Sequence, residues 1–573
     1  MTFALALPKG EYDDAGRCGT DMGRMAALGL SARMTPFLRS PPFPGVDPAI
    51  AAVAVPADGR AAHDRTDTVL DQIRAARVGG CFWGARPDPV RRLMRVGTPI
   101  DARVFAQLDP DQIGLLPGKG AARVAGRMLP ADCDPWHLIE GAQAIHADAE
   151  DDWSLIAGLL GVPVIGADGV AVEPARLHAL LRARLTAAQY RDPFSSAPIS
   201  VSQAIAQLAD WRRHLDGNRG LSAASGMAFW KREAIHAFLW DGERSPPFLS
   251  ARKGLRKARR EGGALAVWPS RVPAAIVARA EADGVPIARV EDGFLRSRGL
   301  GAALYPPGSV VVDRSGIYYN ALQANDLETL LANHDFPPAL VERAARLRAR
   351  ICASGVTKYG AQGGDFPALP QGRRTVLAVG QVDDDLSVRL GGAGVAGNLD
   401  FLERVRRAEP DAFILYRPHP DVQAGHRKGH LTDAVALAHA DAVDSGGSLM
   451  DLVQAVDAVH VLSSLTGFEA LIRGCAVTVH GMPFYAGWGL TRDLAEPSPR
   501  RGRQLTIDAL VAAALILYPR YLDPVTGLPC GPEVMVERLA NGSTPPVTWL
   551  IRVRAMQGKL RRFMTLAAEF FHG

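Results

Sequence analysis

The chain has 573 residues and a net charge of +5; 47% of its residues are hydrophobic and 22% are charged. These proportions are typical of a folded globular protein and exclude a disordered or fibrous chain, and the length predicts three to four domain-sized units. The apolar run Leu510–Leu517 is less than half of the roughly 18 residues that a membrane-spanning helix needs, so a transmembrane protein is not expected.

The amino terminus and the cysteines both indicate a cytoplasmic protein. No basic segment precedes the first apolar residues, and Glu11, Asp13 and Asp14 follow closely, which disfavours a secretion signal. The six cysteines are scattered without C-x-x-C spacing, so neither a disulfide framework nor a zinc site is expected. The small positive charge favours anionic partners, but no known nucleic-acid-binding motif is present, so nucleic acid is not expected as a partner.

The first 215 residues predict a truncated α/β module and contain one half of a weak internal repeat. Residues 135–166 resemble residues 450–481: each reads as an apolar helix, a short strand, a turn, a second helix, a glycine and a second strand. Each copy is followed by a helix and a similar corner, Tyr-Arg-Asp-Pro at 190–193 and Tyr-Leu-Asp-Pro at 521–524. The shared corner favours duplication over convergence of two αβ units.

From about residue 225 the sequence alternates short apolar strands with helices. A segment rich in Gly, Pro and Gln, residues 360–372, separates two such series and indicates a linker. The alternation predicts an α/β fold with two Rossmann-like parallel-sheet halves and a cleft between them. The strands expected are 264–268, 287–290 and 309–313 in the first half, and 375–379, 412–416, 458–462 and 476–479 in the second.

Ligands of such sheets bind at the carboxyl ends of the strands, and four polar clusters follow strands there. After residue 290 comes the acidic pair Glu291-Asp292 and a glycine-rich loop whose Arg296 and Arg298 suit a carboxylate or phosphate. Taken alone, such an acidic pair is more often a helix or turn cap than a catalytic acid. After residue 379 comes Gln381 and the acids at 383–385, which suit a nucleophile or base better than a metal site, since no further carboxylates complete a coordination shell.

The third and fourth clusters suit an anionic donor. Arg417, His419 and Pro420 follow residue 416, and a histidine fixed between two prolines can donate to a phosphate or serve as a buried structural group. The segment from Ser463 to Glu469 begins a helix after residue 462; its hydroxyls and amides form an anion site or a plain N-cap.

These motifs occur in a series that resembles one known family. EDGFLRSRGLG, VVDRSGIYYN, GQVDDDLS, YRPHPDVQAGHRKG, SSLTGFEALIRG, GMPFYAGWGLT and RYLDP, in that order over roughly residues 220 to 540, are similar to the capsular polysaccharide β-Kdo transferases of the KpsC type. The resemblance implies a GT-B glycosyltransferase of Gram-negative bacteria that transfers Kdo from CMP-Kdo to a lipid-linked Kdo acceptor at the cytoplasmic face of the inner membrane. The expected partners are this donor and acceptor, the membrane surface and the capsule export machinery.

The resemblance also implies roles for individual residues. Asp385 is the key carboxylate, with Asp384 as the alternative, Glu291 is its acid/base partner, and His419 faces the CMP phosphate. Such enzymes retain the donor configuration, plausibly by double displacement, and we expect no cofactor or metal besides the CMP-Kdo donor. The donor-binding residues expected are Gln381, Arg417, His419, Pro420, Ser463, Ser464, Gly467 and Glu469.

The resemblance divides the chain into four parts. Residues 1–215 lack the acidic, Gln-acid and His-Pro clusters and are expected to be a degenerate, inactive module; residues 220–370 and 371–545 are the acceptor-side and CMP-sugar halves. Residues 546–573 form a basic amphipathic tail that lies on an anionic membrane or packs on the protein.

Two other functions are alternatives to the transferase. A non-catalytic capsule assembly or export factor could use the same fold for binding alone. An NAD-linked epimerase or dehydrogenase is disfavoured, because no G-x-G-x-x-G follows the first strand of either half. The identity of the ulosonic acid, the linkage, the acceptor length, the oligomeric state and the role of the first module stay open.

Overall fold

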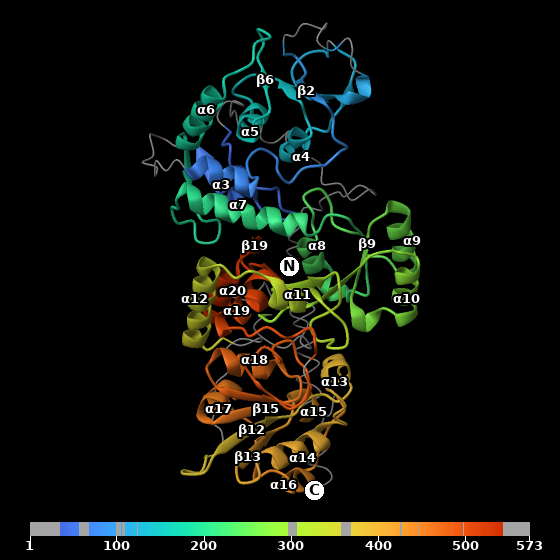
Figure 1. Ribbon diagram of the computed structural model, residues 1–573, viewed down its shortest axis with the longest axis vertical. Coiled ribbons are helices and arrows are strands. Elements are labelled where there is room, and N and C mark those ends of the chain that lie inside the picture. The colour runs from blue at the N-terminus through green and yellow to red at the C-terminus, as the bar shows by residue number, and fades with distance from the viewer. Residues whose placement is uncertain are drawn as a thin grey trace, which may run out of the picture. The chain divides into compact units, whose positions relative to one another are not determined.

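The computed structural model describes residues 35–542 except 57–67, 99–104, 106–108, 123, 296–305, 357–367, 424–426, 445 and 497. The chain divides into two compact units (Figure 1). The first extends to Arg219 and includes residues 239–246 and 526–528, and the second contains the remainder. Within the described ranges, no helix has both the length and the apolar composition required to cross a bilayer.

The first unit is built on a five-stranded parallel sheet of order β4-β3-β2-β5-β6. Its core is apolar and includes the fully buried indoles of Trp136 and Trp211. The strands are β2 (Arg92–Arg95), β3 (Ile113–Leu116), β4 (Arg127–Met128), β5 (Ala144–His146) and β6 (Val164–Ile165), with β1 (Ala54–Pro56) paired to β7 (Ala188–Tyr190). The helices are α2 (Pro48–Ala51), α3 (Thr68–Ala76), α4 (Pro135–Glu140), α5 (Asp152–Leu160), α6 (Pro174–Thr186), α7 (Val201–Asp216) and the 3₁₀ turn η3 (Pro110–Gln112).

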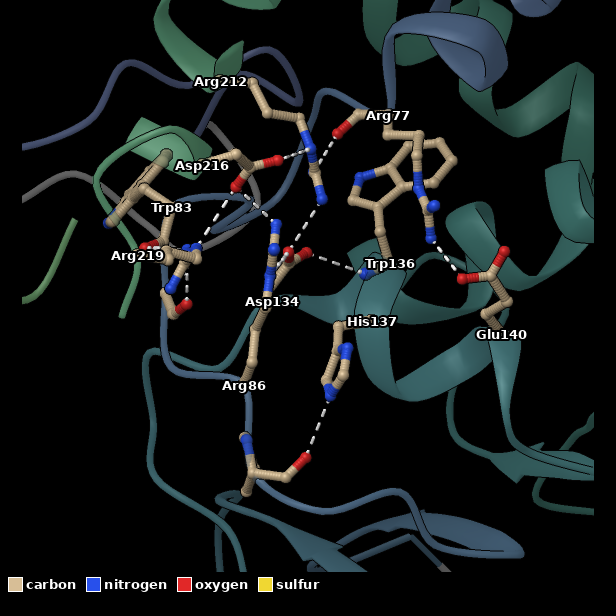
Figure 2. A network of polar contacts seen from close by, with 12 residues as sticks. Arg77, Trp83, Arg86, Asp134, Trp136, His137, Glu140, Arg212, Asp216 and Arg219 are labelled. Atoms are coloured by element: carbon tan, nitrogen blue, oxygen red, sulfur yellow. Dashed lines mark hydrogen bonds and ion pairs between the residues drawn. The ribbon is translucent and has the colours of Figure 1, made fainter. Parts of the chain in front are cut away.

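A buried ion-pair network holds the helices of the first unit together (Figure 2). The fully buried carboxylate of Asp134 accepts from Arg86 Nε at 3.0 Å and from Arg212 Nη2 at 2.8 Å, and it also caps α4 through the amide of Trp136. Asp216, the last residue of α7, binds Arg86 as well, at 2.6 Å. Two cations thus offset the desolvation of one buried acid and link α4 to α7.

The amino-terminal half of the second unit contains a six-stranded sheet of order β19-β18-β11-β10-β9-β8. The predicted parallel pairing is confirmed for β9 and β10, and β8, which was not predicted, is parallel to β9. The prediction of a parallel sheet is wrong for β11, which is antiparallel to β10, and β18 and β19 are antiparallel as well. The strands are β8 (Leu221–Ser225), β9 (Ala264–Val267), β10 (Ile287–Asp292), β11 (Ser309–Asp313), β18 (Pro519–Leu522) and β19 (Pro529–Cys530). The helices are η4 (Phe229–Lys231), α8 (Arg232–Phe238), α9 (Ala251–Glu261), η5 (Pro269–Arg271), α10 (Ala274–Ala282), α11 (Asp326–Asn333), α12 (Pro338–Ser354), α19 (Ile507–Val511), the π-helix η7 (Ala512–Leu517) and α20 (Pro532–Ala540).

The carboxyl-terminal half contains a wholly parallel sheet of order β14-β13-β12-β15-β16-β17, as expected from its continuous apolar strands. The chain turns in opposite directions on the two sides of β12, so the switch point of this sheet lies between β12 and β15. The strands are β12 (Thr375–Val379), β13 (Phe413–Arg417), β14 (Ala442–Val443), β15 (Ala458–Val461), β16 (Ala476–Val479) and β17 (Arg492–Asp493). The helices are α13 (Leu386–Gly391), α14 (Asn398–Ala408), α15 (Pro420–Gln423), α16 (Asp433–Leu437), α17 (Leu449–Ala455) and α18 (Leu465–Ile472).

The element order predicted for the internal repeat is confirmed. The segments α4-β5-α5-β6 and α17-β15-α18-β16 occupy the same places in two sheets that share the order of five strands; the second sheet has β17 in addition. The corners also match: the hydroxyl of Tyr190 donates to the carbonyl of Leu185 at 2.9 Å, and that of Tyr521 donates to the carbonyl of Leu515 at 2.8 Å. The sheet of the first unit is therefore the counterpart of the carboxyl-terminal sheet of the second.

Candidate active site

A cavity of about 630 Å³ lies within the second unit and is lined by both of its halves. In the amino-terminal half, the lining residues lie after β9, at the end of β10 and in the loop after β11. In the carboxyl-terminal half, they lie mainly in the segments that follow β12, β13 and β15. The cavity therefore lies where doubly wound sheets bind ligands. Its walls include Ser270, Glu291, Asp292, Tyr318 and Tyr319 on one side, and Gln381, Asp384, Asp385, Ser387, Arg417, His419, Pro420, Asp421, Arg427, Ser448, Ser463, Ser464, Thr466, Glu469 and Phe484 on the other.

Two acids from the end of β10 face the cavity in different electrostatic surroundings. Asp292 accepts from the ammonium of Lys231 at 2.8 Å, and that ammonium also lies 3.8 Å from the ring centroid of Trp268. Lys231 is buried, so its charge is offset largely by Asp292 and the aromatic ring. Asp292 is thus held by a structural ion pair, whereas the neighbouring Glu291 faces the tyrosines that line the same wall.

Tyr318 and Tyr319 complete this wall, and reasoning from strand ends missed them. Both follow β11, an antiparallel strand, so they are not placed by the rule for parallel sheets. Tyr318 packs edge-on against Phe294, at a centroid distance of 4.8 Å. Burial raises the pKa of Tyr319, and the negative charges of Glu291 and Asp385 add to this effect, so its hydroxyl stays protonated between the two acids. The consecutive tyrosines in the motif VVDRSGIYYN were the sequence feature that could have indicated these two cavity residues.

The three consecutive acids after β12 have three different environments. Asp383 lies outside the cavity lining, and burial raises its pKa. Asp384 lines the cavity and accepts from Arg427 Nη2 at 2.9 Å; this exposed contact lowers the pKa of Asp384. Asp385 also lines the cavity and caps α13, because its Oδ1 accepts from the amide and the hydroxyl of Ser387 at 2.9 and 2.8 Å. The cap holds the Asp385 carboxylate in one orientation.

His419 lies in the cavity wall with a defined hydrogen-bonding pattern. Its Nδ1 accepts from the backbone amide of Asp421 at 3.1 Å, so the proton of the neutral ring resides on Nε2. Arg417 binds Asp444 at 2.8 Å and the carbonyls of Gly446 and Gly447, so most of its donors hold the loop after β14. His419 is therefore the better placed of the two to donate to a ligand.

The switch point between β12 and β15 is closed by an amide–hydroxyl contact. Gln381 accepts from the amide of Ser463 at 2.7 Å and donates to its hydroxyl at 3.2 Å. Ser464 caps α18 through the amide of Thr466, which is the alternative role that the sequence left open, and it also faces the cavity. These groups present uncharged polar atoms to the cavity.

Of the residues predicted for the site, Gly467 is the one outside the cavity lining. A Cβ at this position would lie 2.3 Å from the hydroxyl of Tyr485, so the glycine permits close packing of α18.

Arg296, Arg298 and the tail 546–573 lie outside the described residues. No group of three or more His, Cys, Asp or Glu side chains in the described part of the chain has the arrangement of a metal site. The predicted residues that line the cavity are Glu291, Gln381, Asp385, Arg417, His419, Pro420, Ser463, Ser464 and Glu469.

Several known proteins resemble this chain, and one family model matches the part that forms the cavity. The family model described as capsule polysaccharide biosynthesis protein matches residues 263–364 and 349–521. The capsule polysaccharide modification protein LipA of Neisseria meningitidis serogroup A is 38% identical over 350 residues, which are 61% of this chain and 50% of LipA. The lipopolysaccharide-processing protein LpsZ of Rhizobium meliloti is 47% identical over 246 residues, 41% of this chain and 54% of LpsZ. The chain spans about half the length of these curated relatives.

Two solved structures are also similar to the chain. The β-Kdo 2,7 transferase of Thermosulfurimonas dismutans KpsC is 31% identical, with a TM-score of 0.47, and the match covers 56% of this chain and all of that one. The β-Kdo 2,4 transferase of the same KpsC is also 31% identical, with a TM-score of 0.46, and the match covers 56% of this chain and 98% of that one.

The family-model match contains the whole cavity lining, from Ser270 to Phe484. The two curated relatives carry names that refer to capsule polysaccharide modification and lipopolysaccharide processing. Through residues 263–521, the chain belongs to the family of capsule polysaccharide biosynthesis proteins, as its series of motifs predicts.

Proposed function

We propose that the second unit is a glycosyltransferase that transfers Kdo from CMP-Kdo to a lipid-linked Kdo acceptor, with retention of the β configuration. The observation that carries this proposal is the cavity itself, in which Glu291 and Asp385 come from opposite halves of the unit. A retaining double displacement needs one carboxylate as nucleophile and a second group to move protons. The solved relatives, described as β-Kdo transferases, agree with this sugar.

In the first step, the Asp385 carboxylate attacks the anomeric carbon of the donor, and the bond from that carbon to the CMP phosphate oxygen breaks. CMP leaves with the bonding electrons, and the N–H at Nε2 of His419 donates to the phosphate that forms. In the second step, an acceptor hydroxyl attacks the same carbon, Glu291 takes its proton, and Asp385 is released. Two inversions give net retention.

The protein supplies orientation and charge stabilisation for this sequence. The cap on α13 fixes the orientation of the attacking Asp385 carboxylate. The Gln381–Ser463 contact fixes the side chains that line the donor site between β12 and β15. The protonated hydroxyl of Tyr319 can donate to either acid as its charge changes during the two steps. We propose that these groups act without a metal ion, because the leaving CMP phosphate can be met by histidine, hydroxyl and amide donors.

The first unit is proposed not to transfer sugar. At the edge that corresponds to the donor site, Asp148, Glu150 and Asp151 precede α5, and acids at this position repel a phosphate. This unit would then support the second unit or bind acceptor.

The test is CMP release from CMP-Kdo by the purified protein with a synthetic Kdo-primed glycolipid. Asp385→Asn is the informative variant, because asparagine keeps the helix cap but removes the nucleophile. Asp384→Asn is the matched control, since Asp384 lies in the same loop and is held by the exposed Arg427. We expect Asp385→Asn to abolish CMP release while the control keeps most of it. Equal loss in both variants would contradict the choice of Asp385 as the nucleophile over Asp384, and no transfer by the wild type from any CMP-ulosonate would favour a non-catalytic assembly factor.

A further inference from the structure

Helix α9 presents a continuous basic face that the cavity chemistry does not use. Its sequence, ARKGLRKARRE, contains six basic residues and one acid. Gly254, Leu255 and Ala258 are buried against β8 and β9, and a Cβ on Gly254 would lie 2.8 Å from Leu265. This close packing fixes the rotation of the helix, so the opposite face points to solvent.

The exposed face of α9 is defined by five basic side chains: Arg252, Lys253, Arg256, Arg259 and Arg260. At 3.6 residues per turn they fall within an arc of about 120° along a helix of about 16 Å. Figure 1 shows α9 and α10 side by side next to β9. The basic residues thus form one stripe rather than a scatter of charges.

Much of the charge on this stripe is not neutralised by the protein. Arg259 lies 3.4 Å from Asp283, which also binds Arg279, and Arg260 lies 3.5 Å from Glu261. Within the ranges that the structure describes, no ion pair is formed by Arg252, Lys253 or Arg256. Concentrated positive charge without internal partners is complementary to an anionic surface.

An exposed aromatic ring lies at the same edge of the sheet. Phe229 is 66% exposed in η4, which follows β8. Helix α9 begins at this carboxyl end too, because the amide of Leu249 donates to the carbonyl of Ala224 near the end of β8. Ser270, which follows the neighbouring β9, lines the cavity. The start of the basic stripe and Phe229 therefore share the sheet edge at which the cavity is formed.

We infer that the exposed face of α9, together with Phe229, binds an anionic phospholipid bilayer. Peripheral membrane proteins commonly combine two elements: basic side chains that contact anionic headgroups, and an aromatic side chain that inserts into the membrane interface. A nucleic-acid strand is the less suitable partner, because the stripe has no interleaved aromatic side chains on which bases could stack. The inference is independent of the proposed transfer reaction, since vesicle binding is measured without donor or acceptor.

The test is binding of the full chain to vesicles of mixed phosphatidylglycerol and phosphatidylcholine, with pure phosphatidylcholine vesicles as reference. The key variant is Arg252→Gln/Lys253→Gln/Arg256→Gln. Each basic residue near an anionic surface contributes roughly fivefold to binding, so we expect the triple variant to lose about 100-fold in affinity. Phe229→Ala should cause a smaller loss, and added salt should weaken binding of the wild type.

The matched control is Arg91→Gln/Arg176→Gln/Arg407→Gln, which removes the same charge from exposed positions elsewhere. The inference is supported if this control binds like the wild type while the α9 variant does not. It is overturned if both triple variants lose affinity equally, if the α9 variant binds normally, or if the wild type does not distinguish the two vesicle types. Binding of an RNA oligonucleotide but not of vesicles would also overturn it and would assign the stripe to nucleic acid.

Discussion

The two sheets that share a strand order differ at their carboxyl edges. Between β12 and β15 in the second unit, Gln381 and Ser463 exchange uncharged hydrogen bonds beside an open cavity. Between β2 and β5 in the first unit, Arg95 forms a two-point ion pair with Asp151, both contacts at 2.8 Å, and its third nitrogen donates to the carbonyl of Pro117 at 2.7 Å. One edge presents polar groups for a ligand, and the other satisfies its charges internally.

This difference shows that strand order alone does not make a donor site. Both helices that follow the edge, α5 and α18, begin with a side-chain cap, yet the cap is an aspartate in one and a serine in the other. The Asp151 carboxylate and Arg95 are already bound to each other, so neither is available to a phosphate, whereas a serine hydroxyl can accept or donate. We therefore propose that transfer is confined to the second unit.

The largest expected effect is on transfer activity, which should depend on the aspartate at the edge of the second unit and not on the one at the edge of the first. Asp385→Asn should lower transfer by about 10³-fold or more, because the nucleophile is lost while the cap is retained. Asp151→Asn makes the same chemical change at the helix cap of the first unit and should leave the transfer rate unchanged. Steady-state CMP release measures both. Comparable loss in both variants would show that the first edge takes part in the reaction.

The second effect concerns stability and is confined to the first unit. Asp134→Ala should destabilise this unit by up to about 3–5 kcal/mol, because the buried Arg212 and its neighbour Arg86 lose their buried acid and keep only the more exposed Asp216. The matched change Asp210→Ala, which removes an exposed partner of Arg213 on α7, should cost less than about 1 kcal/mol. Urea unfolding followed by proteolysis of each unit measures the difference, and equal effects would contradict a buried network.

The third effect is a dependence of stability on pH that is greater in the second unit. Burial lowers the pKa of His460 to about 4 and that of His480 to about 3, and the two rings contact each other at 3.1 Å. In the first unit burial lowers the pKa of His146 to about 4. The unfolded rings take up protons at about pH 6.5, so the stability that these neutral rings provide is present above that pH and is lost as the pH falls toward 4.

Between pH 7.5 and 5 this linkage costs roughly 2 kcal/mol for each buried ring. Urea unfolding at the two pH values should therefore destabilise the second unit more than the first. His480→Gln should reduce this difference. A loss of stability with rising pH over the same interval would have the wrong sign for neutral buried histidines.

The smallest predicted effect is on stability, and it tests whether Gly467 is a packing residue or a binding residue. Gly467→Ala should destabilise the second unit by about 1–3 kcal/mol, because the new methyl group meets the Tyr485 ring. Gly394→Ala is a comparison in which the added Cβ has no neighbour within 4 Å, although its positive φ of 81° adds strain. Thermal unfolding measures both. If Gly467→Ala were neutral in stability yet lost CMP-Kdo affinity, the glycine would be a binding residue after all.

The carboxyl-terminal sheet was the most predictable part of the fold. Its strands are continuous apolar runs such as Thr375–Val379, whose bounds agree with the prediction, and parallel sheets require such runs. The polar edge strand β17 and the short β14 were missed, because two-residue strands carry no periodic signal. The strand β8 was missed because its residues, Leu-Ser-Ala-Ala-Ser, are small rather than apolar.

The cavity was predictable where its residues follow parallel strands. Gln381, His419 and Ser463 were found by that rule, and the structure brings them to one cavity. Tyr318 and Phe484 could not be found in this way, since their placement depends on packing with Phe294, at centroid distances of 4.8 and 4.6 Å. Contacts between distant loops depend on tertiary structure that periodicity does not encode.

Whether one unit or both transfer sugar is decided by the mass of the product that the full chain forms with excess CMP-Kdo and a Kdo-primed glycolipid acceptor. If transfer is confined to the second unit, the wild type adds one Kdo residue, Asp385→Asn adds none, and Asp151→Asn still adds one. Addition of two residues by the wild type, or loss of addition in Asp151→Asn with the fold intact, would contradict the assignment of transfer to the second unit alone.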